Sequence, residues 1–326
     1  MVMNTLNQPV ALIAVVGATG SGKSTFINVA SGSNLRVGTS LESCTGEIAF
    51  GNLCQVSGKN VLLIDTPGFD DTVKTQADVL REIASFLKQS YEQGRLLTGI
   101  IYMHRITDLR VGGIARESFC LFRKTCGDDA MNNVVVVTNM WGAVEQQRGE
   151  ERERELATKS LFFKDAIDRG ARMLRHYNTV ESAHAIIHQM LGNVPEVLKM
   201  QHEMVDEHKG SQTTEAGKSL QSELGKQAEK HQKEIRELQE EIKQLKSKGD
   251  KERNSYRQEV NDLKYAQGKL TEKMIALEKE KDKLLKQLDD HDSDCGQCSI
   301  IFSILVARAR ILTLPPSRIN YQPISI

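Results

Sequence analysis

The chain has 326 residues, of which 43 are Lys or Arg and 43 are Asp or Glu, so its formal net charge is zero. The length suggests about two domains, and the neutral balance gives no electrostatic reason to expect a nucleic-acid partner. Hydrophobic residues make up 39% and aromatic residues 5% of the chain. These fractions are low for one compact globule and fit a core-forming domain joined to a long polar extension.

The two ends of the chain carry no recognisable targeting or membrane signal. The apolar run at 10–16 is too short for a signal peptide, and the run at 299–307 is only about half a membrane span. We therefore expect a cytoplasmic protein without a transmembrane segment. We also expect an N-terminal tail at 1–9 and a poorly ordered tail at 291–326.

Residues 10–200 alternate between short apolar runs and longer amphipathic segments. Continuous apolar runs are typical of strands buried on both faces of a parallel sheet. Alternation of such strands with helices predicts a doubly wound α/β domain with a mostly parallel sheet, and Glu47–Val56 fits an edge strand. The predicted strands are Val10–Val16, Asn60–Ile64, Gly99–Met103 and Val134–Val137, and the predicted helices begin near Lys23 or cover Ala77–Tyr91 and Ile114–Cys126.

From about residue 201 the composition becomes rich in Glu, Lys and Gln. We interpret 201–217 as a linker or helical extension and 218–290 as a long α-helical coiled coil, because apolar residues recur at heptad positions a and d. The long step from Leu245 to Tyr256 predicts a local unwinding near Gly249. A coiled coil predicts a homodimer or a partner helix, whereas the alternative is a solvated single helix with many Glu–Lys pairs. The heptad residues are Ile235, Leu238, Ile242, Leu245, Tyr256, Val260, Leu263, Leu270, Met274, Leu277, Leu284 and Leu288.

A glycine-rich loop follows the first predicted strand, with the sequence Gly17-Ala-Thr-Gly-Ser-Gly-Lys-Ser24. It matches G-x-x-x-x-G-K-[ST], in which the glycines let backbone N–H groups point at phosphate oxygens. Lys23 supplies a charge for the β- and γ-phosphates, Ser24 supplies a hydroxyl for magnesium, and the helix that begins here adds its positive end. The residues expected to bind the nucleotide here are Gly17, Gly20, Ser21, Gly22, Lys23, Ser24 and Thr25.

A second motif, Asp65-Thr-Pro-Gly68, ends an apolar strand. A carboxylate at this place reaches the magnesium shell beside the loop. Gly68 can bring a backbone N–H to the γ-phosphate, where a Cβ would crowd it. Taken alone, the motif is also typical of a strand followed by a tight turn, and the loop upstream is what favours the nucleotide interpretation.

Together these motifs resemble the Ras-like (TRAFAC-class) superfamily of P-loop GTPases. The form Asp-Thr-Pro-Gly resembles septins, chloroplast-import GTPases and immunity-associated GTPases. The chain is most similar to a fungal group of G-domain proteins with C-terminal coiled coils, through the segments 41–45, 101–105, 138–141 and 170–176. The resemblance implies GTP or GDP as ligand, a magnesium ion, and a six-stranded sheet with one antiparallel edge strand.

The resemblance also implies roles for particular residues. The switch threonine that binds magnesium beside the γ-phosphate is Thr45, with Thr39 as the alternative and a plain loop role as the third possibility. Asn139 is expected to face the purine, and Ser182-Ala183 resembles the last base-contacting loop. The implied catalytic set is Lys23, Thr45 and Gly68, and the implied magnesium ligands are Ser24, Thr45 and Asp65.

Two departures from the superfamily pattern leave alternatives open. The base-reading motif ends in Asp in those enzymes, but Thr138-Asn-Met-Trp-Gly142 has none, so Trp141 could cover the base instead and Glu145 is the nearest downstream acid. Phe69 stands where those enzymes carry a water-orienting Gln, which predicts slow hydrolysis. His104, Arg105 and Arg110 are candidate aids, and the simpler interpretation of each is structural. An ATP-using P-loop enzyme and a nucleotide-stabilised interaction protein without turnover are the alternative functions.

Overall fold

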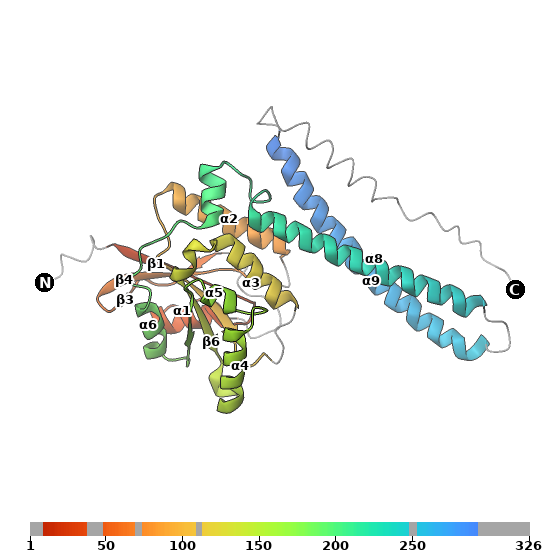
Figure 1. Cartoon of the computed structure of the whole chain (residues 1–326), viewed down its shortest axis with the longest axis horizontal. Coiled ribbons are helices and arrows are strands. Elements are labelled where there is room, and N and C mark those ends of the chain that lie inside the picture. Colours follow the sequence, from red (N-terminus) through yellow and green to blue (C-terminus); the bar gives the residue numbers. More distant parts are fainter. Residues whose placement is uncertain (1–8, 38–47, 69–73, 109–112, 248–252, 293–326) are drawn as a thin grey trace. The chain divides into compact units, whose positions relative to one another are not determined.

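The computed structural model describes residues 9–37, 48–68, 74–108, 113–247 and 253–292. Their centre is a mostly parallel sheet with strand order β2-β4-β1-β5-β6-β7, in which β3 also pairs with β4 (Figure 1). The strands are β1 (Val10–Gly17), β2 (Ala49–Phe50), β3 (Cys54–Val56), β4 (Lys59–Asp65), β5 (Gly99–Arg105), β6 (Val134–Asn139) and β7 (Arg172–Arg175).

Helices cover both faces of this sheet. The helices of the domain are α1 (Lys23–Ser31), α2 (Gln76–Glu92), α3 (Gly113–Cys126), α4 (Gln146–Thr158), α5 (Lys164–Ile167), α6 (Val180–His188) and α7 (Lys199–Gln201). Short 3-10 turns lie at Asp129–Asn133 (η1) and Trp141–Ala143 (η2), and a π-helical turn (η3) covers His202–Asp206. Two long helices follow, α8 (Glu215–Ser247) and α9 (Arg253–Asp292).

The strand β1 shows how the sequence produces two separate cores. Successive side chains of a strand point to opposite faces. Ile13 and Val15 therefore join the core under α1 and α6, whereas Ala14 and Val16 join the core under α2 and α3. Because both faces are buried, the strand is apolar throughout, as parallel sheets require.

The predicted fold class is confirmed, and all four predicted buried strands and all three predicted helices are present. The expected six strands with one antiparallel edge strand were wrong, because the described part of the sheet has seven strands, and both β2 and β3 run antiparallel to β4. Gly51 divides this edge into two. Its backbone N–H donates to Leu63 O at 2.8 Å, and a Cβ on it would lie 2.7 Å from Ile27 Cγ2.

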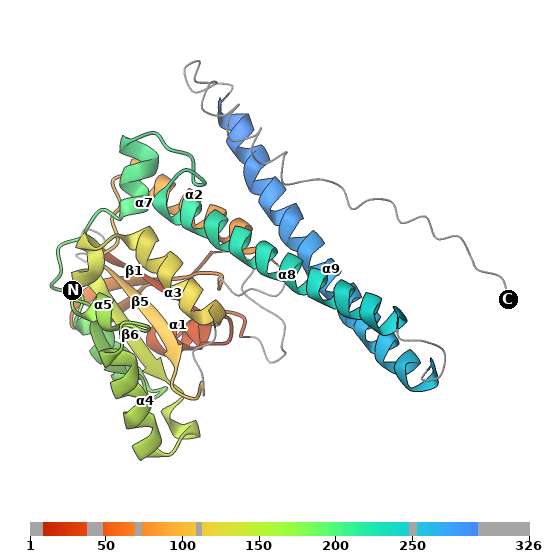
Figure 2. The same cartoon turned by 45° about the vertical axis from the view of Figure 1, so that its right-hand side comes forward.

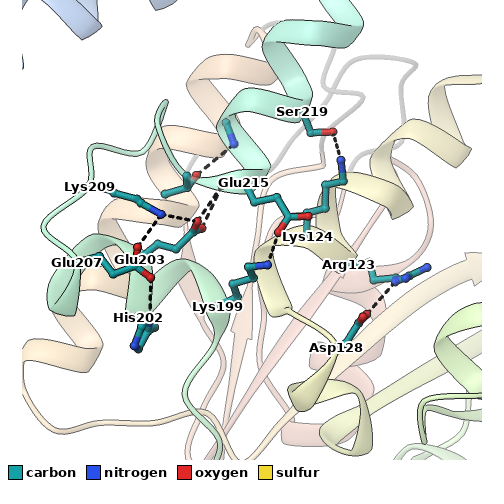
Figure 3. A network of polar contacts seen from close by, with 12 residues as sticks. Arg123, Lys124, Asp128, Lys199, His202, Glu203, Glu207, Lys209, Glu215 and Ser219 are labelled. Carbon is teal, nitrogen blue, oxygen red and sulfur yellow. Dashed lines mark hydrogen bonds and ion pairs between the residues drawn. The ribbon is translucent and has the colours of Figure 1, made fainter. Parts of the chain in front are cut away.

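The start of α8 is fixed to the domain by a buried polar network. Both carboxylate oxygens of Glu203 accept from the backbone N–H of Glu215, at 3.2 and 3.1 Å, which satisfies one of the N–H groups that a helix start leaves unpaired. Lys199 forms an ion pair with Glu215, as Figure 3 shows. The segment 201–217, predicted as a linker or helical extension, contains the buried residues Gln201, Glu203, Thr214 and Ala216.

The helices α8 and α9 lie side by side in Figures 1 and 2 and run in opposite directions. Of the predicted heptad residues, Ile235 and Ile242 of α8 are buried, and Leu263, Leu270 and Met274 of α9 are half-buried. The predicted unwinding near Gly249 lies outside the described residues. Among the residues that are described, no helix is long and apolar enough to cross a membrane.

Candidate functional site

The glycine-rich loop connects β1 to α1 with a backbone that only glycine adopts readily. Gly22 caps α1 in the left-handed region at φ 92°. A Cβ on Gly22 would lie 2.6 Å from Asn139 Nδ2, and one on Gly17 would lie 2.4 Å from the carbonyl oxygen of Met103. These close approaches explain both glycines, because any side chain would displace a neighbouring strand.

The lysine of the loop lies inside the loop itself. Lys23 is 6% exposed, and its Nζ donates to the carbonyl oxygens of Gly17 at 3.0 Å and Ala18 at 2.9 Å. An ammonium group held in this position is the point charge that a bound phosphate chain needs. Thr25 lies half-buried in the first turn of the same helix.

The structure brings two of the predicted magnesium ligands together. Ser24 Oγ donates to Asp65 Oδ2 at 2.5 Å, across 41 residues of sequence. Asp65 is the last residue of β4 and pairs in register with Val15 of β1, so the carboxylate reaches the loop that follows β1. A hydroxyl and a carboxylate are the oxygen ligands that magnesium accepts from proteins, and the pair therefore fits the predicted ion.

The motif that follows Asp65 is held against β1. Thr66 Oγ1 donates to the carbonyl oxygen of Val15 at 3.1 Å, and Gly68 is buried. The switch candidates Thr45 and Thr39, together with Phe69 and Arg110, lie outside the described residues. Their predicted roles remain predictions.

Asn139 lies against the phosphate loop. Its Nδ2 donates to the carbonyl oxygen of Ser21 at 2.6 Å, so the last residue of β6 holds the loop in place. Only the amide nitrogen can donate to a carbonyl, and this bond therefore fixes the orientation of the amide. The Oδ1 atom is buried and has no hydrogen-bond partner in the described structure. Asn139 thus has a positioning role that the sequence did not predict.

Trp141 belongs to the core at the base end of the site. It is 9% exposed, its Nε1 donates to Thr138 O at 3.2 Å, and the guanidinium of Arg175 lies 4.2 Å from its ring centroid. Arg175 is in turn paired with Glu153. An indole covered in this way is occupied by its own neighbours, so the stacking on a base that the sequence suggested has no support in the geometry. Glu145 is exposed and pairs with Arg148 at 3.3 Å.

The strand β5 ends beside the loop with two titratable residues. His104 is 7% exposed and packs edge-on against Phe163, and burial lowers the pKa of its imidazole to about 4. Arg105 pairs with Asp108 at 3.0 Å, and its Nη1 lies 3.5 Å from where a Cβ on Gly20 would be. His104 is therefore a neutral core residue, while Arg105 places a cation beside the loop.

The predicted last loop of the site precedes α6. Ser182 caps this helix together with Thr179, and its hydroxyl lies 2.9 Å from Nδ1 of His176. Burial lowers the pKa of His176 to about 4 as well, and its ring meets Phe26 of α1 edge-on at 4.9 Å. The loop is thereby tied to the helix that begins at Lys23.

Sequence reasoning named Arg105 but could not place it. The position of Arg105 follows from the register of the sheet, because parallel pairing of β1 with β5 sets Gly17 beside Met103. Residues just beyond Met103 must then lie beside the loop that follows Gly17. No sequence signal we recognise predicts that Arg175 covers Trp141, because the two residues come from different elements.

One family model and several solved structures are similar to part of the chain. A family model described as 50S ribosome-binding GTPase matches residues 12–111. No curated protein matches the chain. Among solved structures, Toc33 from Arabidopsis thaliana in complex with GDP and Mg2+ is 15% identical, with a TM-score of 0.44, and the match covers 58% of this chain and 88% of Toc33.

Two further solved structures are similar over the same part of the chain. Aquifex aeolicus Era is 18% identical with a TM-score of 0.42, and the match covers 57% of each chain. The elongation factor SelB from Methanococcus maripaludis is 13% identical with a TM-score of 0.37, covering 57% of this chain and 35% of SelB. The strand order and the Gly17–Ser24 loop, rather than these distant likenesses, identify the P-loop NTPase fold.

Proposed function

We propose that the protein binds GTP and hydrolyses it slowly in a magnesium-dependent reaction, acting as a switch or as a self-assembling GTPase. The observation that carries the proposal is the 2.5 Å contact between Ser24 Oγ and Asp65 Oδ2. It joins the phosphate loop to the strand motif Asp65-Thr-Pro-Gly68 at a single point beside Lys23. The choice of GTP is supported by the GTPase family model, which spans both motifs.

Each residue would act through charge or hydrogen bonding. Lys23 would exchange its loop carbonyls for β- and γ-phosphate oxygens, and the N–H of Gly68 would bind the γ-phosphate. Ser24 and Asp65 would hold magnesium, with Thr45 added in the triphosphate state. The bound ion would neutralise the charge that develops on the phosphate oxygens.

Slow hydrolysis follows from Phe69, whose phenyl ring cannot orient an attacking water. We expect a rate at or below that of unassisted Ras, about 10⁻⁴ s⁻¹. Arg105 is the cation that the described residues place beside Gly20, and it could offset phosphate charge within the same molecule. His104 is buried, so it is not available to a second molecule.

Self-association is the part of the proposal that draws on the long helices. Because α8 and α9 lie side by side within one chain, we propose that α9 is the partner helix that the heptads of α8 predict. A homodimer, or a complex with another protein's helix, would use the helix faces that this pairing leaves exposed. Sedimentation of the full chain in GDP and in a non-hydrolysable GTP analogue measures whether such a dimer forms.

The test of nucleotide binding compares GTP with ATP, each with and without magnesium, on the wild-type chain and on Ser24→Ala. We expect tighter binding of GTP, and a magnesium requirement that Ser24→Ala removes. Tighter binding of ATP would replace the proposal with the ATP-using enzyme. Phosphate release during a single turnover separates a slow GTPase from an interaction protein that binds nucleotide without hydrolysing it.

A further inference from the structure

The end of α9 contacts the first turn of α2 in this structure. Lys283 Nζ lies 2.5 Å from Asp78 Oδ1, and the backbone N–H of Ala77 donates to Glu280 Oε1 at 3.3 Å. Leu284 is 4% exposed and is part of the same core cluster as Ala77. Leu277, about two turns before Leu284 on α9, packs against that cluster.

These contacts use the chemistry of a helix start. The first N–H groups of α2 have no partner within the helix, and the positive end of a helix favours a nearby carboxylate. Glu280 supplies that carboxylate from another helix. Burial raises the pKa of Glu280, which is consistent with a carboxylate that the contact takes out of water.

The two ends of the helix pair are attached with different strength. The start of α8 has the polar network around Glu203 (Figure 3) and two buried leucines, Leu220 and Leu224. The end of α9 is held by the Lys283–Asp78 ion pair, by the contact of Glu280 with the start of α2, and by Leu277 and Leu284. The paired side chains of Lys283 and Asp78 are 47% and 23% exposed, so water screens them and the pair is weak. By these contacts, the end of α9 is the weaker of the two attachments.

The first turn of α2 lies directly downstream of the phosphate-sensing motif. A short connection joins Gly68 to Thr75, the residue that caps α2. We propose that Leu277–Leu284 of α9 docks on the first turn of α2 as an intramolecular partner, and that a bound γ-phosphate loosens this contact. The coupling rests on the proposed function, because it needs a triphosphate that draws Gly68 toward it.

Linkage gives the proposal a second consequence. If the γ-phosphate weakens docking of α9, then loss of docking must strengthen binding of the triphosphate by the same factor. A variant that undocks α9 should therefore favour a non-hydrolysable GTP analogue over GDP more than the wild-type chain does. The substitution that causes this change in nucleotide affinity would lie far along the chain from every nucleotide-binding motif.

The experiment measures backbone hydrogen exchange of residues 274–284 in the full chain. The variants are Lys283→Glu, the charge swap Asp78→Lys with Lys283→Glu, and the control Lys279→Glu, which makes the same charge change at an exposed position of α9. We expect exchange about three- to tenfold faster in Lys283→Glu, since a repulsion replaces a weak ion pair. The charge swap should restore slow exchange, and Lys279→Glu should leave it unchanged.

The same exchange measurement with GDP and with the GTP analogue tests the coupling. Faster exchange with the analogue, and a matching gain in its affinity in Lys283→Glu, would support the proposal. Equal exchange rates in Lys283→Glu and Lys279→Glu would overturn the docking. Equal exchange rates of the wild-type chain with bound GDP and with the bound GTP analogue would overturn the coupling. A chain that binds neither nucleotide would instead refute the proposed function, and the docking comparison would still stand by itself.

Discussion

The two ends of the candidate nucleotide site are built in different ways. At the phosphate end, the loop side chains reach other elements, as Ser24 reaches Asp65 and Asn139 reaches Ser21. At the base end, the large side chain points into the core, where Arg175 covers Trp141. The family model ends at residue 111, so it covers Ser24 and Asp65 but neither Asn139 nor Trp141. Backbone N–H groups and one cation are enough to bind phosphates, whereas the choice between bases requires additional side chains that contact the base.

Acid should destabilise the folded chain through its buried histidines, His104 and His176. Burial lowers the pKa of His104 from 6.5 to about 4, so the unfolded chain takes up the proton first as the pH falls. The stability from neutral His104 is complete above pH 6.5 and is lost toward pH 4, at a cost of about 3 kcal/mol. Urea unfolding at pH 7 and pH 4.5 measures the loss, which His104→Gln should reduce. His188→Gln, at an exposed histidine, is the control and should leave the pH dependence as it is.

Removal of the Lys23 ammonium group should lower the affinity for all nucleotides by the same factor. Lys23→Ala takes away a charge that would pair with phosphates in a partly desolvated place, at about 1.5–3 kcal/mol or roughly 10- to 150-fold in affinity. The affinities for GTP and ATP should fall equally, because the phosphate chain is common to both nucleotides. Fluorescent-nucleotide titration measures this, and circular dichroism checks that helix content is intact. Lys88→Ala, at an exposed lysine of α2, should bind as the wild type does, and unchanged affinity in Lys23→Ala would mean that the loop is not the phosphate site.

How much the sequence could predict differs between these ends for a physical reason. The strand–loop–helix unit of Val10–Ser31 is local, and its glycines and apolar run specify it without reference to the rest of the chain. The burial of Trp141 depends on Arg175 and Gly149, which come from other elements. The strand β7 was missed because it is short and contains two arginines, so it lacks an apolar run. Ile235 and Ile242, two of the predicted heptad residues, are buried, but a heptad pattern does not say whether the partner helix belongs to the same chain or to another.

Loss of the cover over Trp141 should affect folding more than nucleotide binding. Arg175→Met removes a cation 4.2 Å from the indole centroid and one partner of Glu153. We expect about 1 kcal/mol less free energy of unfolding and less than about a twofold change in GTP affinity, which at roughly 0.4 kcal/mol is small. Thermal unfolding and titration measure the two effects, with the exposed Arg154→Met as control. A larger loss of affinity than of stability would place Arg175 in the base site.

The preference of the wild-type chain for GTP over ATP should be modest. Without an Asp at the end of the base-reading motif, we expect a preference of at most about tenfold, or roughly 1.4 kcal/mol. In the alignment that starts the motif at Asn139, Gly142 stands where those enzymes carry the Asp, and a Cβ there would meet no atom within 4 Å in the described structure. Gly142→Asp should therefore be tolerated. It should widen the preference for GTP over ATP, because a carboxylate accepts hydrogen bonds from guanine N–H groups. Gly142→Asn, which is similar in size but neutral, is the control. If Gly142→Asp leaves the ratio of GTP to ATP affinity unchanged, the base lies elsewhere than beside the loop after β6.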